Sequence, residues 1–253
     1  SGDGLTAPDT VKGLADLQEA AELGGAWAAY ELGMIYKHGK FGCVQDLEKA
    51  KSYLLQGAEH GDADAAYILT FMYENGEGVG KDRDAAIAWY ETAAAQGQPY
   101  ACSNLAGFYW DGDGVEQDLE KAAALYQQAA EQGHAYAQAM LGYIECQGLL
   151  GEADQAAGTA WLEKSAAQHF LPAKVYLGRR CLAEGDTERA VDLIRQAAEA
   201  GNMEAMRLLG DLYAKGQGVQ PDDTEAQVWY EKADAEEYGS AKASLASLQA
   251  RLR

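Results

Sequence analysis

Hydrophobic residues recur at helical spacing through residues 98–133, and the pattern is interrupted once. Ala101, Leu105 and Phe108 fall three to four positions apart, which predicts the apolar face of a first helix. Residues 111–114 then read Asp-Gly-Asp-Gly, and glycine readily adopts the positive φ of a helix end and turn. Asp118 offers an N-cap oxygen to a second helix, which Gly133 ends. The pattern predicts a helix–turn–helix unit.

The same pattern recurs about every 36 residues along the chain. The turn glycines that mark this period are Gly25, Gly61, Gly97 and Gly133, after which His169 takes the next place and Gly201 and Gly239 close two further units of 32 and 38 residues. A fixed period of this length is typical of stacked supersecondary units that bury their apolar faces only against neighbours. We therefore expect an all-α protein, an α/α superhelical solenoid of about six tandem helix–turn–helix repeats with capping helices.

The period also predicts the domain layout, a single repeat domain over residues 1–253. Repeats are expected at 26–61, 62–97, 98–133, 134–169, 170–201 and 202–239, with an N-terminal cap at 10–25 and a C-terminal cap helix at 240–253. Two repeats depart from the pattern. The fourth replaces its Gly-x-Gly-Val turn with the residues 148–151, Gly-Leu-Leu-Gly, and the loop of the fifth is four residues shorter.

Composition narrows the classes of partner. With 48% hydrophobic residues the chain has enough apolar material for a core, and its formal charge is −20. Nucleic acid and anionic membrane surfaces are poor partners for such a chain, since phosphate contacts need Lys and Arg. A basic protein is the partner that its field would attract. No apolar run reaches transmembrane length, and the chain begins at Ser1 rather than Met, so we expect that a tag or a targeting segment was removed.

No motif for catalysis or metal binding is found. The four cysteines, Cys43, Cys102, Cys146 and Cys181, show no metal-type pairing and are expected to be free, partly buried thiols. Residues 76–81 resemble a phosphate loop but lack its first glycine and the hydroxyl residue after Lys81. The histidines His38, His60, His134 and His169 lie in different repeats without ligand spacing. A dispersed Ser-His-Asp triad stays open, but nothing resembles a nucleophile elbow. We expect no catalytic residue, no metal and no cofactor.

The repeat resembles the Sel-one-like repeat, a 36-residue relative of the tetratricopeptide class. The sixth unit carries the pattern almost whole, in Ala205, Leu209, Gly210, Tyr213, Gly216, Gly218, Val219, Asp222, Ala226, Trp229 and Tyr230. The resemblance covers residues 26–239. It implies non-catalytic adaptors, assembly scaffolds, host-interaction factors and inhibitors. In bacteria, similar repeats also serve as immunity proteins that neutralise secreted phospholipase-type toxins in the periplasm.

One face of each first helix is left free by the repeat pattern. Its positions are counted from the alanine that stands four residues before the repeated leucine, as Ala65 stands before Leu69. They lie one before that alanine and two, six, nine and ten after it, and form one stripe along the expected concave groove. We expect Trp27, Tyr100 and Tyr136, near helix starts, to pack against neighbouring repeats more often than Tyr67, Phe71 and Trp110. The predicted partner-binding residues are Tyr30, Met34, Tyr67, Phe71, Glu74, Trp110, Asp111, Tyr143, Arg179, Arg207 and Asp211.

These observations predict a non-catalytic module, monomeric alone, that binds another protein in its groove. The sharper hypothesis is an inhibitor or immunity protein of the bacterial envelope, placed in the periplasm rather than the cytoplasm, which neutralises a basic or amphipathic secreted effector such as a phospholipase toxin. The alternative is an adaptor or scaffold that recognises peptide segments in complex assembly or host interaction.

Overall fold

The computed structural model describes residues 7–234, 243, 244, 246 and 248. This part of the chain is helical and contains no strand. The helices are α1 (Ala7–Glu22), α2 (Ala26–His38), α3 (Leu47–Glu59), α4 (Ala63–Asn75), α5 (Arg83–Ala95), α6 (Pro99–Asp111), α7 (Leu119–Glu131), α8 (Ala135–Gln147), α9 (Gln155–Ala167), α10 (Leu171–Glu184), α11 (Thr187–Glu199), α12 (Met203–Lys215) and α13 (Asp223–Asp234). The all-α solenoid class predicted from the sequence is confirmed. The cap helix expected at 240–253 lies for the most part outside the described residues.

Local capping explains where the helices begin and end. The Asp118 carboxylate accepts a hydrogen bond from the Lys121 backbone N–H at 2.9 Å, so it is the N-cap predicted for the second helix of its repeat. Asp46 and Asp82 cap α3 and α5 in the same way. Such a cap satisfies one of the backbone donors that a helix start leaves unpaired.

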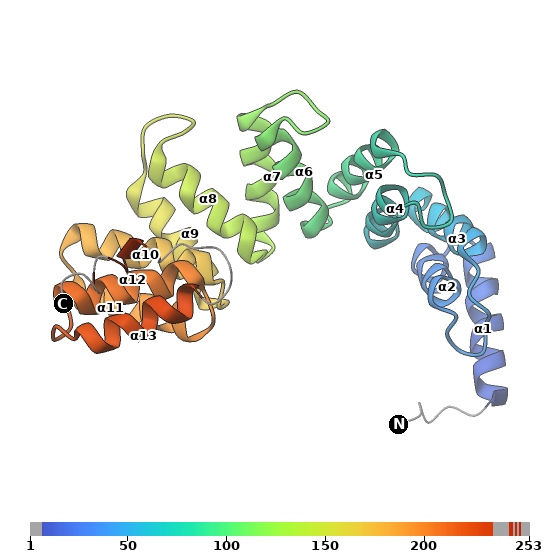
Figure 1. Ribbon diagram of the computed structural model, residues 1–253. Helices are drawn as coiled ribbons and strands as arrows, with labels where there is room; N and C mark the ends of the chain where they lie inside the picture. Colours follow the sequence, from blue (N-terminus) through green and yellow to red (C-terminus); the bar gives the residue numbers. More distant parts are fainter. Residues whose placement is uncertain (1–6, 235–242, 245, 247, 249–253) are drawn as a thin grey trace. The chain divides into compact units, whose positions relative to one another are not determined.

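The helices fall into two compact units. Unit 1 is residues 1–134, with α1 to α7, and unit 2 is residues 135–253, with α8 to α13. Within each unit, consecutive helices form hairpins that stack side by side (Figure 1). We call α2, α4, α6, α8, α10 and α12 the first helices and α3, α5, α7, α9, α11 and α13 the second helices. Helix α1 packs on α2, where Ala21 is buried together with Ala28, Ala29 and Leu32.

Small residues bring the two helices of a hairpin close together. On α8, a Cβ added to Gly142 would lie 2.8 Å from the carbonyl oxygen of Gly158 on α9. A Cβ on Gly158 would lie 2.7 Å from the carbonyl oxygen of Gly142. No real Cβ makes contacts this short, so only glycine permits this crossing.

The first repeat is one residue longer than the sequence period suggests. The left-handed turn glycine before α2 is Gly24, with φ of 87°, and not Gly25, which is an extended N-cap with φ of −68°. The extra residue lies in the loop 39–46, which is one residue longer than the loop 76–82 of the next repeat. The regular spacing of glycines disguised this shift, because two glycines stand side by side at positions 24 and 25.

The two irregular repeats depart in their loops. In the fifth repeat, α10 ends at Glu184 and α11 begins at Thr187, so only Gly185 and Asp186 connect them. In the second repeat, Gly78 approaches the start of α3, and a Cβ added there would lie 2.7 Å from the Cβ of Leu47. The fourth repeat holds Leu150 at the corresponding loop position, where its side chain is 45% exposed.

The four cysteines are free thiols, with Cys102, Cys146 and Cys181 buried and Cys43 partly buried. This agrees with the expectation from their spacing. In the described ranges, no helix combines the length and the apolar character that crossing a membrane requires.

Candidate partner-binding surface

The first helices present a mixed face of rings and charges, which we call the first-helix face. It comprises, on each first helix, the positions one before and two, six, nine and ten after the repeat alanine, which is Ala28, Ala65, Ala101, Ala137, Ala173 or Ala205. Three positions of this predicted stripe do not belong to the surface, since Ser103 and Val175 are each only 3% exposed and Cys146 is 5% exposed. Ser103 and Val175 stand two residues after the repeat alanine and Cys146 stands nine after it, where the helix turns toward its neighbours.

In unit 1 the rings on this face pack together. The Tyr67 ring on α4 lies 4.9 Å from the Phe71 ring and 6.1 Å from the Tyr100 ring on α6, measured between centroids. It also lies 6.2 Å from the ring of Tyr90, which α5 contributes from behind. We call Tyr67, Phe71, Tyr90 and Tyr100 the aromatic cluster. Offset and edge contacts of this kind stabilise ring pairs beyond their buried area.

Exposure follows the opposite order from the one expected. Trp27, Tyr100 and Tyr136 are 63%, 54% and 43% exposed, although the sequence predicts packing more often for them than for the other three rings. Tyr67, Phe71 and Trp110 are half-buried. The rings near helix starts do touch neighbours, as Tyr100 does with His134, but each leaves a large part of its surface to solvent. The most accessible anchors are therefore at the helix starts.

A polar group lies beneath the aromatic cluster. The Asn104 side-chain amide donates to the hydroxyl oxygens of Tyr67 and Tyr90 at 3.4 and 3.5 Å, and the Tyr90 hydroxyl donates to Glu74 at 3.3 Å. Burial raises the pKa of Tyr90 to about 12, and the Glu74 carboxylate adds to this rise. The hydroxyl therefore stays protonated at neutral pH and can hold Glu74 at the edge of the rings.

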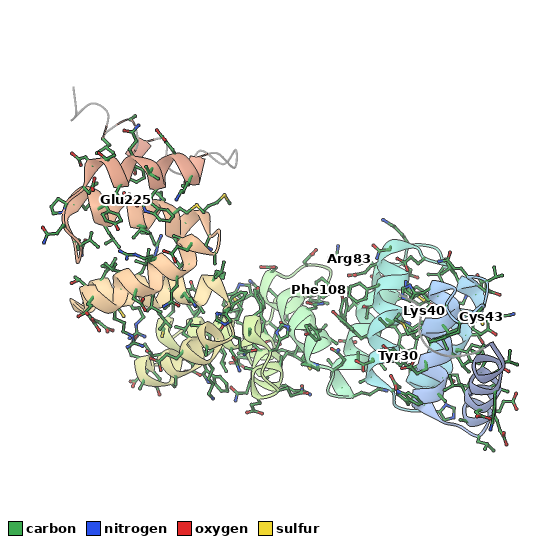
Figure 2. The ribbon with its side chains drawn as sticks, turned by 90° about the horizontal axis from the view of Figure 1, so that it is seen from below. Tyr30, Lys40, Cys43, Arg83, Phe108 and Glu225 are labelled. Carbon is green, nitrogen blue, oxygen red and sulfur yellow. The ribbon has the colours of Figure 1, made fainter. Side chains whose placement is uncertain are left out.

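Carboxylates surround the rings at the start of α4. Burial raises the pKa of Tyr30 on α2, and the negative charges of Asp64, Glu31 and Asp62 raise it further. All three carboxylates therefore act on the Tyr30 hydroxyl, which lies on the first helix of the first repeat (Figure 2). Asp64 also accepts a hydrogen bond from the buried Gln98 amide at 3.3 Å. This end of the unit 1 face is aromatic and acidic.

The other predicted residues of unit 1 flank this centre. Met34 is half-buried, and the neighbouring Lys37 pairs with Glu77. Trp110 is half-buried and Asp111 is exposed at the end of α6. On the far side of that helix, the Arg83 guanidinium lies 5.7 Å from the centroid of the Phe108 ring, and both are labelled in Figure 2.

In unit 2 a ring contact and an ion pair connect neighbouring first helices on the first-helix face. Tyr143 on α8 is 38% exposed and meets the Tyr176 ring on α10 edge-on at 6.0 Å. Arg179 on α10 pairs with Glu204 on α12. Both contacts join consecutive first helices, so they tie the face of unit 2 together across repeats.

A second polar group lies on α12 and α13, at the last repeat of the unit 2 face. Arg207 and Asp211, four residues apart on α12, form an ion pair at 2.9 Å, and the Tyr230 hydroxyl of α13 donates to Asp211 at 2.7 Å. Burial raises the pKa of Tyr230, and its hydrogen bond to Asp211 raises it further. Tyr230 holds the Asp211 carboxylate from behind, as Tyr90 holds Glu74 in unit 1.

The charge of the chain is divided unequally between the units. Unit 1 holds 22 acidic and 8 basic residues, a formal charge of −14, whereas unit 2 holds 18 and 12, a formal charge of −6. Seven of the eight arginines belong to unit 2. The acidic field of the protein thus originates mainly in unit 1, on the same unit as the aromatic cluster.

Sequence reasoning missed the supporting groups of both faces. Tyr90 and Tyr230 stand in the repeated apolar pattern of the second helix, which by itself predicts only a packing role. Their hydroxyls reach carboxylates on the first helix, and no local pattern encodes that distance. Among the described residues, no three His, Cys, Asp or Glu side chains gather in a way that could hold a metal ion. The arrangement offers rings and charges for contact with another molecule.

Comparison with known proteins places these repeats in a family. The model of the Sel1 repeat matches residues 28–62, 63–98, 99–134, 135–170, 172–202 and 204–233. No curated protein matches the chain.

Solved structures show the same fold. A Sel1 repeat protein from Oxalobacter formigenes is 29% identical, with a TM-score of 0.74 over 87% of this chain and 86% of that one. A protective antigen of uropathogenic Escherichia coli with an SLR fold is 27% identical, with a TM-score of 0.65 over 95% of this chain. The match spans only 60% of the antigen's own length.

A third structure is similar in fold alone. An immunity protein from Pseudomonas aeruginosa is 17% identical, with a TM-score of 0.50 over 83% of this chain and 80% of that one. The six matches to the family model cover most of the chain. The chain therefore belongs to the Sel1 repeat family, whose repeats form a non-catalytic protein-interaction fold.

Proposed function

We propose that this protein binds a basic protein partner through its first-helix faces and has no catalytic activity of its own. The observation that carries the proposal is the unit 1 face, where half-buried and exposed rings adjoin Glu31, Asp62 and Asp64. Aromatic residues supply much of the energy at protein interfaces, and a cation over a ring face gains further attraction. A partner segment that carries Lys or Arg side chains between apolar ones can pair with the carboxylates and pack on the rings.

The finer form of the proposal is an inhibitor or immunity protein that neutralises a secreted effector enzyme, such as a phospholipase toxin. Its support is the charge of −14 on unit 1, which favours fast capture of a basic enzyme. The proposed contacts are Tyr30, Met34, Tyr67, Phe71, Glu74, Trp110 and Asp111 in unit 1 and Tyr143, Arg179, Arg207 and Asp211 in unit 2. The likeness to an immunity protein supports the fold alone.

Affinity capture from the source cell and its secreted fraction tests the proposal. Wild type is compared with a variant in which Tyr67, Phe71 and Trp110 are replaced by alanine. A second variant, Trp27→Ala with Tyr100→Ala, removes the two most exposed rings and keeps the contacts of Tyr67 with Phe71 and Tyr90. The control, Val44→Ala with Val228→Ala, removes exposed apolar side chains from a loop and from a second helix.

We expect wild type and the control to retain one basic protein and both ring variants to lose it. Loss of that protein's enzymatic activity on mixing identifies an inhibitor, whereas a retained peptide segment without inhibition identifies an adaptor. A partner that both ring variants retain at full affinity contradicts the first-helix faces as the binding surface. Circular dichroism of each variant shows that the fold is preserved.

A further inference from the structure

A notch opens on the second-helix side of unit 2, away from the first-helix face. Helices α9 and α11 form its walls and α10 lies behind them. Its volume is about 330 Å³, and Ala166, Ala167, Leu177 and Leu193 give it an apolar lining. None of these residues has a part in the proposed function, so the notch is an independent feature.

A buried lysine points into this notch. Lys174 lines it, is only 8% exposed and donates from its Nζ to the Gln196 side-chain oxygen at 2.7 Å. Gln196 is held for this role, since its amide nitrogen donates to Asp192 at 2.7 Å. Over the residues that the structure describes, Lys174 forms no ion pair. A buried ammonium with only a neutral acceptor is costly unless an anion accompanies it.

The other charges of the notch are already matched. Arg189 on α11 pairs with Glu163 on α9, so their charges cancel at the wall. His169 also lines the notch and stands in the turn before α10, where its side chain is exposed. Lys174 is therefore the charged side chain of this lining that has no ion-pair partner.

Unit 1 contains the same notch without the lysine. It lies between α5 and α7, has a volume of about 380 Å³ and repeats the lining with Ala94, Ala95, Leu105 and Leu125. Glu91 and Lys121 repeat the ion pair of the wall, and Gln128 stands where unit 2 has Gln196. The position of Lys174 is held by Cys102, which is fully buried.

This comparison shows that the repeat does not need a charge at that position. The residue after the repeat alanine is Ala29 in the first repeat, Ala66 in the second, Cys102 in the third, Gln138 in the fourth and Met206 in the sixth. Each of these side chains is neutral and fits the same scaffold. The lysine therefore adds a binding group to a notch that is otherwise structural.

We propose that the unit 2 notch binds a carboxylate carried on an apolar stem, with the Lys174 ammonium as its ion-pair partner. A single unmatched ammonium suits a monoanion better than a doubly charged phosphate. The apolar lining accommodates the stem, whose burial is favourable. The carboxylate can come from a free aliphatic acid or from the terminus of a protein chain that ends in an apolar residue.

Methyl-detected NMR on the intact protein tests the site and separates the two sources. Butyrate represents the free acid and N-acetyl-leucine represents a chain terminus, with butyramide, N-acetyl-leucinamide and inorganic phosphate as matched controls. We expect both carboxylates to shift the methyl signals of Ala166 and Ala167. Tighter binding of butyrate indicates a free acid as the ligand, and tighter binding of N-acetyl-leucine indicates a chain terminus. The equivalent Ala94 and Ala95 of unit 1 are the internal reference and should not shift.

Two variants test the role of the lysine. Lys174→Met places the side chain found at the equivalent position of the sixth repeat, and Lys174→Cys reproduces the notch of unit 1. Either should raise the dissociation constant of the carboxylates by about tenfold or more, because a charge-assisted hydrogen bond is lost. Equal shifts with the amides or with phosphate, unchanged binding in the variants, or no shift at Ala166 and Ala167 would overturn the proposal.

Discussion

At the scale of single residues, the chain separates side chains that hold the repeats together from side chains available to a partner. Leu105 on α6 is 2% exposed, whereas Phe71 on α4 is half-buried and its neighbour Tyr67 shares its contacts. Removing the two side chains therefore affects different properties, the stability of the stack and the surface of the first-helix face.

The first prediction compares these two residues. Leu105→Ala should lower the free energy of unfolding by about 2–5 kcal/mol, because it leaves a cavity between stacked helices. Phe71→Ala should cost about 1 kcal/mol, since it removes one edge contact between rings. Chemical denaturation of both variants measures the difference. If the two substitutions cost the same, Phe71 is a core residue and not part of the first-helix face.

The second prediction concerns alkaline pH. Tyr90 has its pKa raised to about 12 in the folded protein, whereas the unfolded chain ionises near the ordinary value of 10.0. Protons are then lost from the unfolded state first, so the stability that the neutral hydroxyl contributes is present below about pH 10 and is lost as pH rises toward 12. Tyr90→Phe should lose less stability than wild type over this interval, measured by urea denaturation at several pH values. An identical decline in both proteins would contradict burial of the hydroxyl.

At the scale of elements, the turns between repeats determine how the hairpins follow one another. The turns use glycine in the left-handed region, as at Gly97 with φ of 87° and Gly133 with φ of 88°. The turn between α9 and α10 instead places His169 there, with φ of 62°. A side chain in this region is strained by contact with its own backbone.

The third prediction follows from that strain. His169→Gly should raise the free energy of unfolding by about 1 kcal/mol, because glycine adopts this φ without a clash and the gain outweighs its greater freedom in the unfolded chain. Thermal unfolding of the variant measures the change. The matched control is Gly133→Ala, which should destabilise because it introduces the same strain elsewhere. A destabilised His169→Gly variant would show that the imidazole makes a contact worth more than the strain.

At the scale of the whole molecule, charge is the property that distinguishes the two units. The formal charge of −14 on unit 1 acts over roughly one Debye length, about 10 Å in 0.1 M salt. Its effect should therefore appear in the rate at which a basic partner is captured, more than in the rate at which it dissociates.

The fourth prediction is a salt dependence of that capture. Raising the salt concentration from about 0.05 M to about 0.5 M should slow association with the partner by on the order of tenfold, measured by surface plasmon resonance. The variant Asp62→Asn with Asp64→Asn should show a smaller dependence, because it removes two charges near Tyr30. Since the Asp62 carboxylate also caps α4, a thermal melt checks that the helix is intact. An association rate that does not change with salt contradicts a basic partner.

Much of this architecture follows from the sequence alone, because its determinants are local. Helix starts and ends depend on residues within one turn of each other, as Asp118 and Lys121 show. The apolar spacing of Ala101, Leu105 and Phe108 is likewise a property of one helix. Such short-range rules, repeated six times, specify the helices, the loops and the fold class.

Only the tertiary structure decided what lies between helices. The aromatic cluster joins rings from three helices, and the hydroxyls of Tyr90 and Tyr230 reach acids that are 16 and 19 residues away in sequence. The placement of Lys174 in a notch depends on residues of α9 and α11. A periodic pattern shows which face of a helix is apolar, but the distance between side chains on different helices depends on how closely the backbones approach. That approach is determined by packing, and packing is a property of the folded chain.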